Sequence, residues 1–203
     1  MNRCVLIQAN GNGERMKDYF GIPKHHLYYK GDKIINNIIS NIQNTGIDYY
    51  IATKYKQDGL GKNIILCMDT NNRLQTLQYC LEYLQNYDSI IVHDCDVIFD
   101  SKCISNMYGD MISISAYKQD GYKYGFISID NNLQYKNGNE KIKEEPFITT
   151  GIYSFNRKNM QEFIAKNQES ETLLDYYNTH NPKLYYTEEF TNLGDINSYM
   201  NNI

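Results

Sequence analysis

The chain has 203 residues, of which 41% are hydrophobic and 22% are charged, and its formal net charge at pH 7 is -4. This length is enough to bury one core without disulfides, and the weak negative charge argues against a general nucleic-acid or anionic-membrane surface, so any phosphate recognition must be local. The sequence has no C-x-x-C pair and no run approaching the roughly 18 apolar residues of a membrane span. We therefore expect a cytoplasmic protein whose five cysteines are reduced core residues.

The first half alternates short apolar runs with helical patterns, which is typical of βαβ units around a largely parallel sheet. We predict strands at 4–9, 49–53, 64–67 and 89–94 and helices at 34–42 and 71–86. From Met111 onward the pattern predicts β-rich segments at 112–117, 124–130 and 149–155, with short helices at 157–166, at 171–177 and at the C-terminus. We expect one α/β domain over 1–203, with halves at 1–110 and 111–203 and a mixed sheet.

A glycine-rich segment, QANGNGERM at 8–16, follows the first predicted strand. The backbone amides of Gly11 and Gly13 can approach phosphate oxygens, and Arg15 adds a planar donor. No Gly-Lys-Ser/Thr follows, so this is not a Walker A loop, and Met16 stands where the dinucleotide fingerprint has its third glycine. Taken alone, the segment indicates either a phosphate-binding loop or a tight turn that contains two glycines.

Two aspartates, Asp94 and Asp96, stand at the end of the strand predicted at 89–94. Side chains alternate along a strand, so both carboxylates are expected on one face and Cys95 on the other. Carboxylates at a strand end suit Mg²⁺, which uses one or two of them together with substrate phosphates. The alternative is a solvated acidic strand end. The four histidines have no zinc-ligand spacing, and we interpret them as surface groups or as groups that support the site.

The order of several segments along nearly the whole chain resembles the sugar-phosphate and alcohol-phosphate nucleotidyltransferases. That family carries L-A-A-G-x-G-x-R-M, then P-K, then G-K-P-L-I, and the matching residues here are Gly11, Gly13, Arg15, Met16, Pro23 and Lys24. The sequence departs from this pattern at Gln8, Asn10 and Asp32-Lys33. YGFISID (124–130), EEPFITTGIYSF (144–155) and NLGDINSY (192–199) resemble later family segments. The resemblance implies a Rossmann-like GT-A fold with a mixed, mostly parallel central sheet flanked by helices.

The resemblance also implies a role for each matched position. The nucleotide would be bound by Gln8, Ala9, Asn10, Gly11, Gly13, Arg15 and Asp94, with Gln75 at the base. The second substrate would contact Lys24, Thr150, Gly151 and Glu145, or Glu140 in place of Glu145. The metal ligands would be Asp96, Asp94 and Asn192, with Asp195 replacing Asn192 if the register shifts, although Asp195 can equally be the N-cap of the last helix. Arg15, Lys24 and Asp96 would be the catalytic residues.

The implied reaction is attack of a sugar 1-phosphate or phosphorylated small alcohol on the α-phosphorus of a nucleoside triphosphate. Pyrophosphate leaves, and the product is an activated precursor of the kind used for surface polysaccharide or a related glycoconjugate. No general base is required, because the second pKa of a phosphate monoester is about 6. CTP is the favoured triphosphate, because cytidylyltransferases for small phosphorylated alcohols are similarly compact.

Two alternatives remain open. A GT-A glycosyltransferase would share the fold and the acidic motif, but it binds no triphosphate and does not need the G-x-G-x-R…P-K run. A catalytically silent nucleotide-binding module is the other alternative, given the altered positions at Asn10, Asp32 and Asn192. The sequence indicates no oligomeric state.

Overall fold

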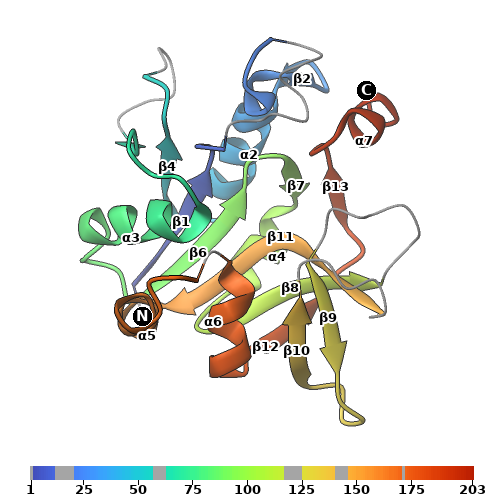
Figure 1. Cartoon of the computed structure of the whole chain (residues 1–203). Coiled ribbons are helices and arrows are strands. Elements are labelled where there is room, and N and C mark those ends of the chain that lie inside the picture. The colour runs from blue at the N-terminus through green and yellow to red at the C-terminus, as the bar shows by residue number, and fades with distance from the viewer. Residues whose placement is uncertain (1, 12–20, 57–62, 117–124, 140–145, 171) are drawn as a thin grey trace.

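The computed structural model describes residues 2–11, 21–56, 63–116, 125–139, 146–170 and 172–203. A mixed sheet forms its centre (Figure 1). Its parallel part has β1 (Arg3–Gln8) between β4 (Asp48–Thr53) and β6 (Ser89–Asp94), with β5 (Ile64–Leu66) beyond β4. The chain runs outward from β1 through β4 to β5 and then returns to the other side of β1. This reversal creates a topological switch point, where ligands of open α/β sheets bind beyond the carboxyl ends of the strands.

The second half of the chain continues the same sheet. β11 (Phe147–Asn156) lies antiparallel to β6, and β8 (Met111–Ala116) lies antiparallel to β11. β12 (Lys183–Tyr186) is parallel to β8, while β9 (Phe126–Ile129) and β10 (Tyr135–Asn139) branch from β11. The predicted mixed, mostly parallel sheet flanked by helices is therefore confirmed.

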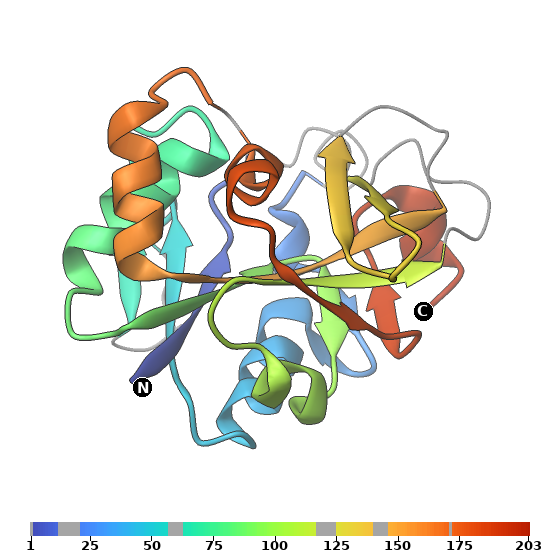
Figure 2. The same ribbon diagram turned by 90° about the horizontal axis from the view of Figure 1, so that it is seen from below.

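Helices cover both faces of the sheet (Figure 2). α3 (Arg73–Tyr83), α5 (Arg157–Lys166) and α6 (Leu173–His180) pack into one core cluster, and α2 (Ile34–Gln43) and α4 (Ser101–Asn106) pack into the other. The predicted isoleucine spacing explains α2, because Ile34, Ile35, Ile38 and Ile42 are all buried. Within the described residues, no helix combines the length and apolar character needed to cross a membrane.

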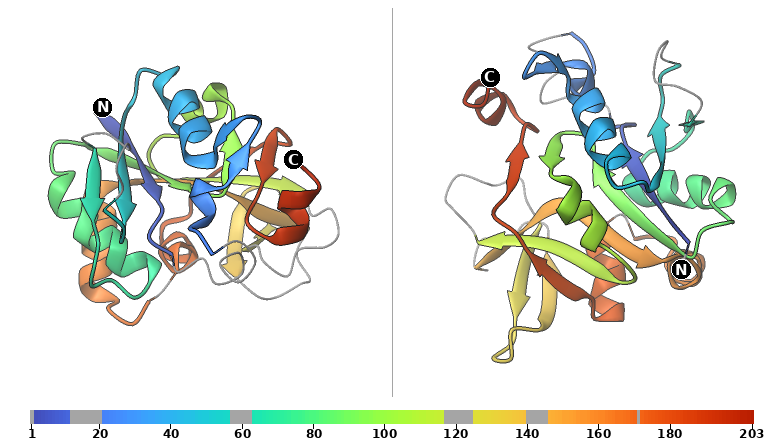
Figure 3. Two further views of the ribbon diagram at one scale, coloured as in Figure 1. Left: turned by 90° about the horizontal axis from the view of Figure 1, so that it is seen from above. Right: turned by 180° about the vertical axis from the view of Figure 1, so that it is seen from behind.

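Short elements close one end of the sheet. η1 (Lys24–His26) leads into the hairpin of β2 (Tyr28–Tyr29) and β3 (Asp32–Lys33), and β7 (Val97–Phe99) pairs with β13 (Phe190–Asn192). α7 (Ile196–Met200) lies beside the hairpin (Figure 3), where the Tyr199 hydroxyl donates to the Tyr28 carbonyl at 2.7 Å. Through this contact, α7 near the C-terminus packs against the β2–β3 hairpin.

The cysteines are part of the core. All five are unpaired and buried, as predicted from their apolar surroundings. Burial raises the pKa of the Cys95 thiol to about 11 and that of Cys103 to about 12, so both remain protonated near pH 7.

Candidate active site

A cavity of about 560 Å³ lies beyond the carboxyl ends of β1, β4 and β6. Gln8 and Asp94 reach it from the ends of β1 and β6, and Thr150 and Gly151 from the middle of β11. This is the position that the reversal of strand order at β1 predicts for a ligand site.

Asp94 is the last residue of β6, and its carboxylate forms an ion pair with Arg73. Arg73 begins α3 directly after the N-cap Asn72, whose side chain accepts from the Gln75 amide. The Arg73 Nε donates to the Gln8 Oε1 at 2.8 Å, and its guanidinium carbon lies 5.3 Å from the centre of the Tyr153 ring. Arg73 therefore connects β1, α3, β6 and β11 at the cavity wall.

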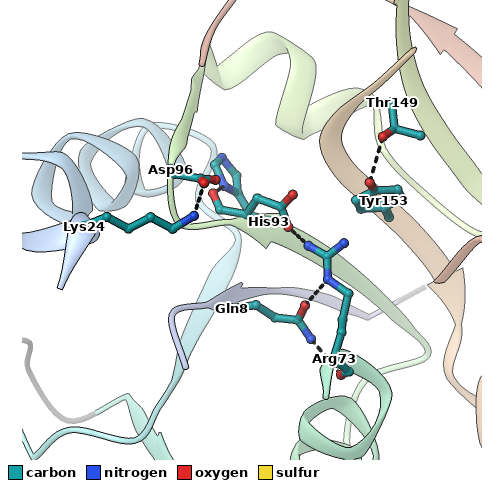
Figure 4. Close-up of polar contacts among 8 residues, drawn as sticks. Gln8, Lys24, Arg73, His93, Asp96, Thr149 and Tyr153 are labelled. Atoms are coloured by element: carbon teal, nitrogen blue, oxygen red, sulfur yellow. Dashed lines mark hydrogen bonds and ion pairs between the residues drawn. The ribbon is translucent and has the colours of Figure 1, made fainter. Parts of the chain in front are cut away.

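Asp96 lies in the turn between β6 and β7 and forms an ion pair with Lys24 (Figure 4). The backbone of this turn is held by the residue that follows β13, because the Leu193 amide donates to the Asp96 carbonyl at 2.7 Å. Lys24 comes from η1 on the opposite wall, directly after Pro23. The two aspartates thus reach one cavity, as predicted, and each of them faces a side-chain cation.

The oxygen donors around Asp96 have the chemistry that Mg²⁺ prefers. A Cβ placed on Gly194 would lie 2.6 Å from the Asp96 Oδ2 and 3.1 Å from the Asn192 Oδ1, so both oxygens face the space beside this glycine. Among the described residues, no three His, Cys, Asp or Glu side chains are grouped to hold a metal. A cation here would therefore use two carboxylates, an amide oxygen and substrate phosphates, a set that the residues present do fit.

β11 is irregular where it passes the cavity. Its register against β8 shifts between Thr149 and Tyr153, and Gly151 within this irregularity has a φ of 100°. A Cβ on Gly151 would lie 3.0 Å from the Val97 side chain and 3.1 Å from the Asp94 Oδ2. Glycine is therefore required at position 151 both for the backbone conformation and for the close approach of Asp94.

We expect Gly151→Ala to lower the free energy of unfolding by about 1–3 kcal/mol, the usual cost of a side chain in a strained backbone conformation. It should also slow turnover, because the added Cβ displaces the Asp94 carboxylate. Urea unfolding and steady-state kinetics measure the two effects. Gly46→Ala is the matched control, since Gly46 has a φ of 69° with no atom near its hypothetical Cβ. It should lose stability without losing turnover, and equal kinetic effects in both variants would contradict the prediction.

The structure brings most of the predicted site residues to the cavity wall: Gln8, Asn10, Gly11, Lys24, Asp94, Asp96, Thr150, Gly151, Asn192 and Asp195. Ala9 is buried and its amide donates to the Ala52 carbonyl at 2.8 Å. Asp195 is the N-cap of α7 and accepts from the Asn197 and Ser198 amides, as one of the two interpretations held. Gly13, Arg15, Glu140 and Glu145 lie outside the described residues.

The structure places Gln75 differently from the sequence-based interpretation. Gln75 is exposed and is not on the cavity wall; its Oε1 accepts from the Asn71 amide at 2.9 Å, and residues 70–73 line the cavity instead. His25 and His93 are 2% and 0% exposed, so of the two interpretations of the histidines, that of groups that support the site fits these two and that of surface groups does not. Burial lowers the pKa of His93 to about 4, so its imidazole is neutral at pH 7 and its Nδ1 donates to the Asp94 carbonyl at 2.7 Å.

Two departures from the family pattern have a structural explanation. The Asn10 amide nitrogen donates to the hydroxyls of Thr70 and Thr76 at 2.6 and 2.7 Å, which ties the chain after β1 to the start of α3. Gln8 also links β1 to the start of α3, because its Oε1 accepts a hydrogen bond from the Arg73 guanidinium. Arg73 itself was not predicted as a site residue, because a single arginine after an N-cap carries no local signal that it reaches the end of β6.

Comparison with known proteins supports this architecture. No family model matches the sequence. The bifunctional protein GlmU of Clostridioides difficile (strain 630) is 25% identical over an alignment that covers 91% of this chain and 44% of that protein, so the chain spans less than half of that relative. Among solved structures, a UDP-glucose pyrophosphorylase complexed with UDP-glucose has a TM-score of 0.84 at 14% identity, covering 100% of this chain and 97% of that one. The inositol-1-phosphate CTP transferase from T. maritima has a TM-score of 0.71 at 12% identity, covering 98% and 91%. The expected fold is thereby confirmed.

Proposed function

We propose that this chain, which has the fold of the sugar-1-phosphate nucleotidyltransferases, transfers a nucleoside monophosphate from a nucleoside triphosphate to a phosphate monoester and releases pyrophosphate. The acceptor is a sugar 1-phosphate or a phosphorylated small alcohol. The observation that carries this proposal is the convergence of Gly11, Lys24 and Asp96 on one cavity at the switch point of the sheet. These residues come from the three motifs whose order along the chain resembles that of the family.

The chain's own groups account for most of the chemistry. The acceptor phosphate is largely ionised near pH 7, so the reaction needs positioning and charge neutralisation rather than a general base. Lys24 supplies a positive charge at the cavity wall, where the backbone amide of Gly11 would donate to a phosphate oxygen of the triphosphate. When bound, Mg²⁺ would neutralise charge on the phosphates, with Asp94, Asp96 and Asn192 as its protein ligands.

CTP is the first triphosphate to test. The structural relation to an inositol-1-phosphate CTP transferase supports this choice. The relation to a UDP-glucose pyrophosphorylase makes UTP with glucose 1-phosphate the second pair. Either product would be an activated precursor for a polysaccharide or a related glycoconjugate.

The proposal is tested by mixing the chain and Mg²⁺ with one of four triphosphates and a panel of sugar 1-phosphates and phosphorylated alcohols. Release of pyrophosphate that depends on one acceptor is the expected result. Release of a nucleoside diphosphate from a nucleotide sugar would instead identify a glycosyltransferase. Binding of a triphosphate without turnover on any acceptor would identify a catalytically silent module.

A further inference from the structure

Both acidic residues of the cavity are paired with side-chain cations. Asp94 pairs with Arg73, and Asp96 pairs with Lys24. The side chains of Arg73 and Asp94 are 28% and 23% exposed, so the pair lies in a partly desolvated place where charges interact more strongly than at the surface. The cations therefore occupy carboxylates that the proposed function assigns to a divalent metal.

Arg73 has two further contacts that would remain if its ion pair with Asp94 were broken. Its Nε donates to the Gln8 Oε1 at 2.8 Å, and its guanidinium lies over the Tyr153 ring at 5.3 Å. Neither group carries a charge that competes for the outer nitrogens. A guanidinium held in this way keeps its two outer nitrogens for an anion, and its planar fork matches phosphate oxygens.

The charges in the cavity indicate how the ion pairs of Asp94 and Asp96 would change when a metal ion and a triphosphate bind. A divalent cation at Asp94 and Asp96 brings two positive charges, which makes the pairing of these carboxylates with Arg73 and Lys24 unnecessary. A triphosphate brings several negative charges into the same cavity of about 560 Å³. The released side-chain cations would then neutralise phosphate oxygens, so that neither the carboxylates nor the phosphates lack a partner.

Resting on the proposed function, we propose that Arg73 is an exchangeable counter-ion: it pairs with Asp94 until a divalent cation takes its place, and it then binds the phosphates of the nucleotide. Arg73 thus competes with the metal and cooperates with the triphosphate. A purely structural role, in which Arg73 braces Asp94 in every state, predicts neither of these relations. The two roles therefore differ in the sign of their effect on metal binding.

Two binding titrations on Arg73→Gln, neither of which requires turnover, separate these roles. Mn²⁺ binding, measured from the electron paramagnetic resonance signal of the free ion, should become at least about threefold tighter, since pairs of this kind contribute up to about a fivefold change in affinity. Binding of inorganic tripolyphosphate in buffer with saturating Mg²⁺, measured by calorimetry, should become about tenfold weaker, because a charge-assisted contact is lost. Tripolyphosphate carries no base, so the second readout reports phosphate contacts alone.

Arg157→Gln is the matched control. Arg157 begins α5 directly after the N-cap Asn156, as Arg73 begins α3 after Asn72, and it donates to the Tyr87 carbonyl and the Gln161 side chain outside the cavity. The Arg157→Gln substitution therefore removes the same charge from the same kind of helix position as Arg73→Gln does. Both dissociation constants should stay within about twofold of the unmodified chain, as expected for a charge that does not line the cavity and is screened by solvent ions.

Arg73→Lys provides a second variant that keeps the charge. It should return Mn²⁺ affinity toward that of the unmodified chain while recovering only part of the tripolyphosphate affinity, because lysine lacks the planar fork. Unchanged or weaker Mn²⁺ binding in Arg73→Gln would overturn the proposal. Failure of the pyrophosphate assay would remove the proposed function but would leave these two titrations, and the exchange that they measure, unaffected.

Discussion

Replacement of Asp96 by asparagine is expected to lower the rate of pyrophosphate release by about a hundred- to a thousandfold, the usual cost of losing one group that stabilises transition-state charge. The substitution keeps the shape of the side chain and removes its negative charge. The Asp96 side chain is only 13% exposed, so few neighbouring groups can replace its carboxylate. The turnover number at saturating Mg²⁺ and substrates is the measurement.

The control for this substitution lies at the other end of the same strand. Asp88 precedes β6 at its amino end, and its Oδ2 accepts from the Asn2 amide at 2.9 Å, far along the strand from the cavity. Asp88→Asn should therefore retain nearly full turnover. If Asp96→Asn also kept its turnover within about threefold, the place of Asp96 in the transition state would be contradicted.

Replacement of Lys24 by methionine is expected to lower kcat/KM for the acceptor phosphate by about a hundredfold, because a charge-assisted hydrogen bond in a partly buried site contributes about 1.5–3 kcal/mol. The side chains of Lys24 and Asp96 are 19% and 13% exposed. Methionine keeps the apolar stem of lysine and removes the ammonium group, which isolates the effect of charge.

The acceptor and the triphosphate give separate readouts for this variant. We expect the KM of the acceptor to rise more than the KM of the triphosphate, because the resemblance assigns Lys24 to the acceptor. Lys166→Met, at an exposed position near the end of α5, is the control and should leave both constants unchanged. A rise confined to the triphosphate would assign Lys24 to the other substrate.

The predictable part of the fold consists of elements with a strong local pattern. The buried runs of β1, β4 and β6 and the isoleucine spacing of α2 each carry their own signal. β7 and β13 do not, because each has three residues and forms only through pairing with a distant segment, as Val97 pairs with Asn192. Neither segment shows an alternating pattern or a separate apolar run that would indicate a strand by itself.

The candidate site follows the same rule. Asp94 and Asp96 were predicted from strand alternation, and both reach the cavity, although Asp96 lies in the turn after the strand. Lys24 was predicted from its resemblance to the P-K motif. Arg73 was missed, because its contacts with Gln8 and Asp94 join residues that are far apart in sequence, and only the packing of α3 against the sheet brings them together. The local pattern around Arg73 indicates a helix start and nothing more.

In the proposed reaction, the acceptor phosphate and pyrophosphate exchange at the α-phosphorus of a nucleotide. Because every step of such a transfer is reversible, the most direct measurement supplies the chain and Mg²⁺ with radiolabelled pyrophosphate and one nucleoside diphosphate derivative at a time. Label should enter the nucleoside triphosphate with the correct derivative and not in its absence. Appearance of a nucleoside diphosphate or free sugar, with no label in any triphosphate, would contradict it.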